Sequence, residues 1–130
     1  MKFDIYTGYY AQMKNYRKAG LIPVSIAWGT PVWYEGETCF EVAPPYKLIK
    51  AYKTEGMSIE EYSKKYIEHL DTNVKWSAVL KRFKEISDKY KGADLVLVCF
   101  EKPEDFCHRH LLADYLNDDD ICDCMEWKVK

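Results

Sequence analysis

Side chains that can do chemistry crowd into eleven positions of this chain. Cys99 and Glu101 stand two residues apart, and Cys107, His108 and Arg109 follow in a row. In an extended strand, residues two apart point to the same side, so Cys99 and Glu101 share a face. Thiolates act as nucleophiles, carboxylates and imidazoles transfer protons, and a guanidinium binds phosphate or carboxylate. The combination predicts a site that acts on, or binds, a small anionic ligand.

Three interpretations of these residues remain open. In the first, Cys107 or Cys99 is a nucleophile, and His108 or Glu101 moves protons. In the second, Arg109 and a helix N-terminus bind the anion, and the cysteines line the pocket. In the third, Cys99, Cys107 and His108 are metal ligands. The chain has no C-x-x-C motif, and two adjacent helix residues cannot easily reach the same ion, so we expect no metal. Ordinary core packing of each cysteine is the alternative to all three.

The elements around these residues are predicted from the apolar pattern. Residues 95–98 form an unbroken run of leucine and valine, which is typical of a central strand covered on both faces. Pro103 ends the strand, and residues 108–116 follow as a helix whose first turn favours a thiolate. Ligands of open α/β sheets bind at the carboxyl ends of the strands, where Cys99 and Glu101 lie.

The rest of the chain predicts a single three-layer α/β/α domain over residues 1–130, with a mostly parallel sheet of about four strands. A helix at 9–18 joins two β-prone runs, which is a βαβ unit. Ser58 and Glu61 have the spacing of a capping box, which starts another helix. The predicted strands are 3–7, 21–27, 94–100, a short edge strand at 38–42 and a closing strand at 121–129; the other helices are 47–53, 58–70 and 72–91.

The loop between Trp28 and Tyr46 is long and rich in aromatic rings, so we expect it to roof the pocket. In a parallel sheet, residues after the first two strands open onto the same edge as Glu101. These residues are the further candidates for substrate binding, with core packing as the alternative for the tyrosines: Thr7, Tyr9, Tyr10, Ser25, Trp28 and Trp33.

Composition narrows the functional class. The chain has 130 residues and a net charge of −2, which argues against a protein that chiefly neutralises nucleic-acid phosphates. Basic residues on the helix at 72–91 are interpreted as a solvated face, so nucleic acid is only weakly supported as a partner. No signal peptide and no run of ~20 apolar residues is present, and we expect no membrane association. Five cysteines without an export signal favour reduced thiols in a cytoplasmic protein.

The motif resembles that of a family called domain of unknown function 488. Its pattern is Cys, an aromatic residue and Glu, then a proline-containing turn and Cys-His-Arg opening a helix, as in Cys99-Phe100-Glu101, Pro103 and Cys107-His108-Arg109. The N-terminal strand with Tyr9-Tyr10, the segment 22–34 and Ala43-Pro44 are also similar. The resemblance implies prokaryotic or phage-borne soluble relatives and a shared fold and site, but no substrate. Relatives commonly carry an arginine where this chain has Ala27-Trp28.

The sequence thus predicts an enzyme that acts on a small anionic or nucleotide-like ligand, without a cofactor. Cys107 is the favoured thiolate, Glu101 and His108 transfer protons, and Arg109 binds the anion. The alternative is a binding module without chemistry, in which Glu101 and Arg109 form a buried structural clasp. The oligomeric state does not follow from the sequence.

Overall fold

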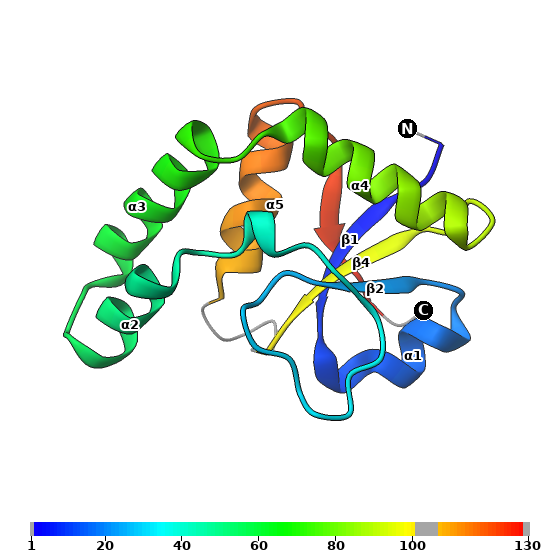
Figure 1. The fold of residues 1–130 in the computed structure, drawn as a ribbon, viewed down its shortest axis with the longest axis horizontal. Coiled ribbons are helices and arrows are strands. Elements are labelled where there is room, and N and C mark those ends of the chain that lie inside the picture. The colour runs from blue at the N-terminus through cyan, green and yellow to red at the C-terminus, as the bar shows by residue number, and fades with distance from the viewer. Residues whose placement is uncertain (1, 101–106, 129–130) are drawn as a thin grey trace.

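The computed structural model describes residues 2–100 and 107–128, and these form one parallel sheet with helices on both faces (Figure 1). The strand order is β3-β2-β4-β1-β5, and every pairing is parallel. The sheet therefore has five strands where about four were expected, and the predicted fold class is confirmed. The strands are β1 (Ile5–Tyr9), β2 (Ile22–Ser25), β3 (Glu37–Thr38), β4 (Leu95–Cys99) and β5 (Cys124–Glu126).

The helices form two layers, one against each face of the sheet. A short helix, α1 (Met13–Lys18), follows a 3-10 turn, η1 (Tyr10–Gln12), and buries Met13 and Tyr16 against Val96 and Val98. The opposite layer contains α3 (Ile59–Thr72), α4 (Trp76–Lys89) and α5 (His108–Asp118), with α2 (Tyr46–Thr54) packed on α3. Figure 1 shows α1 on one side of the strands and α4 and α5 on the other. None of the helices in the described part of the chain is long and apolar enough to span a bilayer.

Strand β4 lies at the centre of the sheet, as its apolar run predicted. All five of its residues are buried, because β1 and β2 pair with its two edges and helices cover its two faces. Leu95 and Leu97 belong to the core under α3, α4 and α5, whereas Val96 and Val98 face α1. The parallel register places the carboxyl end of β4, at Cys99, beside the carboxyl ends of β1 and β2.

Several element boundaries differ from the predictions. Strand β1 continues through Gly8 to Tyr9, because it pairs with β4 as far as Cys99, and the hydroxyl end of Tyr16 lies where a Cβ at position 8 would stand. The edge strand β3 is shorter than predicted, and residues Phe40–Val42 form a 3-10 turn, η2. The predicted capping box is present, since the Ser58 hydroxyl accepts a hydrogen bond from the Glu61 backbone N–H at 3.1 Å.

Candidate functional site

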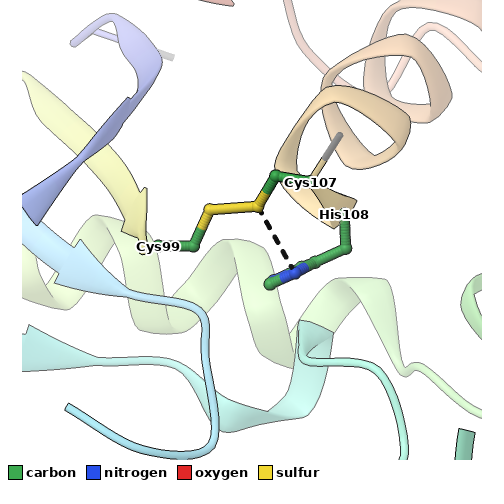
Figure 2. Close-up of side chains that lie close together, drawn as sticks. All are labelled: Cys99, Cys107 and His108. Carbon is green, nitrogen blue, oxygen red and sulfur yellow. Dashed lines mark hydrogen bonds between the residues drawn. A yellow bond between two sulfur atoms is a disulfide. The ribbon is translucent and has the colours of Figure 1, made fainter. Parts of the chain in front are cut away.

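The fold brings Cys99, Cys107 and His108 together at the carboxyl end of β4. Cys99 is the last residue of β4, Cys107 is the N-cap of α5 and His108 is the first residue of that helix. The two cysteines are joined by a disulfide, and Figure 2 shows their sulfur atoms between the end of the strand and the start of the helix. Both thiol positions are almost fully buried, with 1% and 4% of each residue exposed.

His108 is held as a neutral ring with one nitrogen directed at Cys107. Its Nε2 lies 2.8 Å from the carbonyl oxygen of Ile26, and a carbonyl can only accept, so Nε2 carries the proton. The other nitrogen, Nδ1, lies 3.8 Å from Cys107 Sγ and offers a lone pair to it (Figure 2). Burial lowers the pKa of His108 to about 4, and the positive charge of Arg109 acts in the same direction, although the hydrogen bond to Ile26 opposes it. The ring is therefore a proton acceptor at neutral pH.

Arg109 is fully buried and touches the opposite end of the disulfide. Its Nη1 donates to Cys99 Sγ at 3.0 Å. Its Nε and Nη2 donate to the two carboxylate oxygens of Glu126 at 3.1 and 3.0 Å, which is a bidentate pair. Thr7 donates to the same carboxylate at 2.7 Å. The charge of Arg109 is thus balanced inside the protein, and its orientation toward Cys99 is fixed by three strands and one helix.

A cavity of about 190 Å³, termed here the site cavity, opens beside this cluster. Cys99, Cys107 and His108 line it from the sheet edge and α5. Its remaining described walls are mainly aromatic and come from the loop after β2, from α2 and α3, and from Phe100. Lys53 contributes the charged group among these described residues. The full lining is Ala27, Trp28, Gly29, Tyr46, Ile49, Tyr52, Lys53, Tyr62, Cys99, Phe100, Cys107 and His108.

Of the six further candidates for substrate binding, Trp28 lines the site cavity and the other five do not. Thr7 is bonded to Glu126, and the ring of Tyr9 lies 5.7 Å from the Arg109 guanidinium carbon. The hydroxyls of Tyr10 and Ser25 form a buried 2.6 Å hydrogen bond. The ring of Trp33 packs edge-on against Tyr10. These four contacts lie among residues that do not line the cavity, and Tyr10 also contacts two cavity-lining residues, the ring of Phe100 and the Gly29 carbonyl.

Two carboxylates, Glu101 and Glu126, matter for the predicted pairing with Arg109. Glu101 lies outside the described residues, so neither its proton-transfer role nor its clasp with Arg109 is addressed by the structure. The described carboxylate partner of Arg109 is Glu126, which was not among the predicted site residues. One signal was available: Cys124-Met125-Glu126 repeats the Cys-x-Glu spacing of Cys99-Phe100-Glu101.

The aromatic lining supplied by α2 and α3 was also missed. Tyr52 and Tyr62 occupy ordinary helix positions in the sequence, where a ring predicts core packing as readily as a cavity wall, whereas Tyr46 ends the loop that was expected to roof the pocket. Only the packing of α2 and α3 beside the carboxyl end of the sheet brings them to the site.

The other three cysteines are unpaired and stand apart from the cavity lining. Burial raises the pKa of Cys122 to about 11 and that of Cys124 to about 12. Burial also raises the pKa of Cys39 far above its ordinary value, and a hydrogen bond to Glu41 adds to this effect. All three are therefore thiols, not thiolates, near neutral pH.

Cys99, Cys107 and His108 also have the composition of a three-ligand metal site. Their donor atoms all lie within 4.8 Å of one another, and thiolates with an imidazole suit zinc. In the disulfide form neither sulfur has a thiolate to offer. A metal would therefore require the reduced form of the chain.

The fold and site define a parallel α/β domain with a cysteine–histidine–arginine cluster at the carboxyl end of its central strand. The chain matches the family model DUF488-N3a, described as the active DUF488-N3 subclade, over residues 22–120, and it belongs to that family. The resemblance inferred from the motif is thereby confirmed. No curated protein and no solved structure matches the chain.

Proposed function

We propose that this protein is an enzyme that acts on a small anionic or nucleotide-like ligand, with the thiol of Cys107 as its nucleophile. The observation that carries the proposal is the contact between Cys107 Sγ and His108 Nδ1 on the wall of the site cavity. Nucleophilic catalysis requires a nucleophile, a base and a group that orients the base. Here the Ile26 carbonyl orients His108. The word "active" in the family description agrees with this proposal.

The site cavity sets the size and type of ligand. Its volume of about 190 Å³ is close to the ~150 Å³ of a cavity that holds a single benzene ring. Rings of Trp28, Tyr52 and Tyr62 offer faces and edges for a planar group, while Lys53 supplies positive charge for an anion. A ligand with one ring-sized moiety and a negative charge, such as part of a nucleotide, fits these walls.

The proposed step begins from the reduced chain. His108 Nδ1 accepts the proton of the Cys107 thiol, and the thiolate forms a carbon–sulfur bond with an electrophilic carbon of the ligand. The bond from that carbon to the leaving group breaks, and the leaving group takes the proton from His108. Water then attacks the same carbon, the carbon–sulfur bond breaks, and the thiol of Cys107 is restored.

We propose a role for Arg109 that differs from the anion binding predicted from the sequence. Arg109 is engaged with Glu126 and Cys99 in the interior, so we propose that it stabilises negative charge on Cys99 and does not contact the ligand. A binding module without chemistry would need the Glu126–Arg109 pair but would not need a base directed at a cavity-lining thiol.

The proposal is tested by alkylation of the fully reduced chain. Cys107 is expected to react with iodoacetamide near neutral pH faster than a free cysteine, and the variant His108→Gln is expected to slow it toward the rate of a free thiol. Tandem mass spectrometry assigns the label to individual cysteines, and Cys122 serves as the internal control because its raised pKa keeps it protonated.

Two outcomes would remove support from the proposal. One is a Cys107 that reacts no faster than Cys122 in the reduced, folded chain. The other is one equivalent of zinc or iron in the reduced protein by elemental analysis, because the thiolates would then be metal ligands and unavailable as nucleophiles.

A further inference from the structure

The disulfide between Cys99 and Cys107 has unequal surroundings at its two ends. Cys99 Sγ accepts a hydrogen bond from a buried guanidinium, whereas Cys107 Sγ faces a neutral imidazole. Both residues line the site cavity, so a small molecule that enters it meets the sulfur–sulfur bond directly. The other three cysteines have no comparable cation bonded to the sulfur in the described residues and form no disulfide.

We propose that Cys99 and Cys107 form a reversible dithiol–disulfide couple. Cys107 is the residue that small thiols attack and that peroxides oxidise. Cys99 is the leaving group during reduction and the resolving cysteine during oxidation. This goes beyond the proposed nucleophilic reaction, because it gives the same site a two-electron redox activity. It also makes that reaction redox-gated, since the disulfide form has no free Cys107 thiol.

Reduction follows from the asymmetry. The thiolate of a small external thiol attacks Cys107 Sγ, the bond between the two protein sulfurs breaks, and its electron pair leaves with Cys99. Arg109 stabilises the departing thiolate, and thiols that are stabilised as thiolates leave faster. A second external thiol attacks the mixed disulfide at the external sulfur and releases Cys107. In sum, two external thiols become one external disulfide, and the protein gains two hydrogens.

Oxidation by a peroxide runs through the same residues. The Cys107 thiolate attacks a peroxide oxygen, the oxygen–oxygen bond breaks, and hydroxide leaves with the proton held by His108. Cys107 is then a sulfenic acid, which condenses readily with a nearby thiol. Cys99 attacks Cys107 Sγ, the disulfide forms, and the second hydroxide leaves as water with the proton of Cys99. One peroxide is reduced to two waters for each disulfide formed.

Glu126 and Thr7 are positioning residues for this couple. Glu126 binds two of the Arg109 nitrogens and so directs the third, Nη1, at Cys99. Thr7 in turn fixes the Glu126 carboxylate. Thr7 in β1 and Glu126 in β5 both lie outside the segment 22–120 that matches the family model. These two strands therefore add residues to a site whose motif lies within that segment.

The test uses hydrogen peroxide and dithiothreitol on the full chain. Trypsin does not cleave between Lys102 and Pro103, so both cysteines fall in one peptide, residues 92–109. Free thiols are blocked with one reagent, the protein is reduced, and the new thiols are labelled with a second. After one equivalent of peroxide, peptide 92–109 is expected to carry two second labels, and after dithiothreitol on the folded chain it is expected to carry none.

Single variants test the asymmetry. Cys99→Ser is expected to stop at a sulfenic acid on Cys107 that dimedone traps, whereas Cys107→Ser is expected to give at least tenfold less dimedone adduct on Cys99. Arg109→Lys is expected to slow reduction by dithiothreitol roughly tenfold, the rate equivalent of a charge-assisted hydrogen bond. Cys122→Ser is the matched control and is expected to leave both reactions unchanged.

Three results would overturn the inference. The first is that peroxide oxidises the Cys99–Cys107 dithiol no faster than it oxidises Cys122. The second is equal dimedone labelling in Cys99→Ser and Cys107→Ser. The third is that dithiothreitol reduces the disulfide only after the chain is unfolded. If Arg109→Lys fails to fold by circular dichroism, the serine variants still decide. The alkylation rate of reduced Cys107 is read separately, so loss of the redox couple would leave the proposed function standing.

Discussion

Acid is expected to destabilise this fold through one buried histidine. The pKa of His108 is lowered from 6.5 to about 4 because the ring is buried, with 9% of the residue exposed. Between pH ~4 and pH ~6.5, His108 is therefore neutral in the folded chain but protonated in the unfolded chain. The free energy of unfolding therefore keeps its full value above pH ~6.5 and falls as the pH drops toward ~4. The difference between the unfolded and folded pKa values of His108 corresponds to a loss of ~3 kcal/mol.

The measurement is the free energy of unfolding in urea at several values between about pH 7 and pH 4.5, on the oxidised chain. His108→Gln is the matched variant, because the glutamine amide can still donate to the Ile26 carbonyl but does not titrate. The stability difference between the two proteins is expected to shrink by ~2 to 3 kcal/mol across this range, while carboxylates that titrate in both proteins cancel. Parallel curves for the two proteins would show that His108 is not held neutral by the fold and would refute the reasoning.

Three further predictions concern stability. Ser58→Ala is expected to cost ~1 kcal/mol in urea unfolding, because the Glu61 N–H loses its side-chain acceptor, and Ser58→Asp, which restores an acceptor, is expected to recover it. Tyr66→Phe is expected to cost ~1 to 3 kcal/mol, because the buried hydroxyl bonds the Val42 carbonyl at 2.6 Å and phenylalanine leaves that carbonyl unsatisfied; no loss in unfolding free energy would contradict this. Burial opposes ionisation of Glu37, but hydrogen bonds from a lysine and a tyrosine in and after α4 lower its pKa overall, so the stabilisation by Glu37 is expected to be present above pH ~4.5 and lost below it. Comparison of Glu37→Gln with the parent chain by thermal unfolding at two pH values checks this, and an equal difference at both would count against it.

Much of the fold follows from local patterns in the chain. The unbroken run at 95–98 predicts a strand buried on both faces, and only a central position in a sheet buries both. The start of α3 is predicted because the Ser58 side chain can satisfy the free backbone N–H of Glu61. The strand limits are less predictable, because Gly8 and Tyr9 belong to β1 through their pairing with Val98 and Cys99, which are distant in sequence.

The motif between Cys99 and Arg109 identifies the location of the site without the structure, because thiols, an imidazole and a guanidinium rarely gather by chance at a strand-to-helix turn. Its internal geometry depends on residues that are distant in sequence. The Ile26 carbonyl selects the tautomer of His108 that is protonated at Nε2, and Glu126 turns Arg109 away from the cavity and toward Cys99. Side-chain types and spacing carry no information about such partners, because they approach only when parallel strands from both ends of the chain are paired. The assignment of a role to each member of the motif is therefore a property of the packed sheet, while the presence of the motif is a property of the sequence.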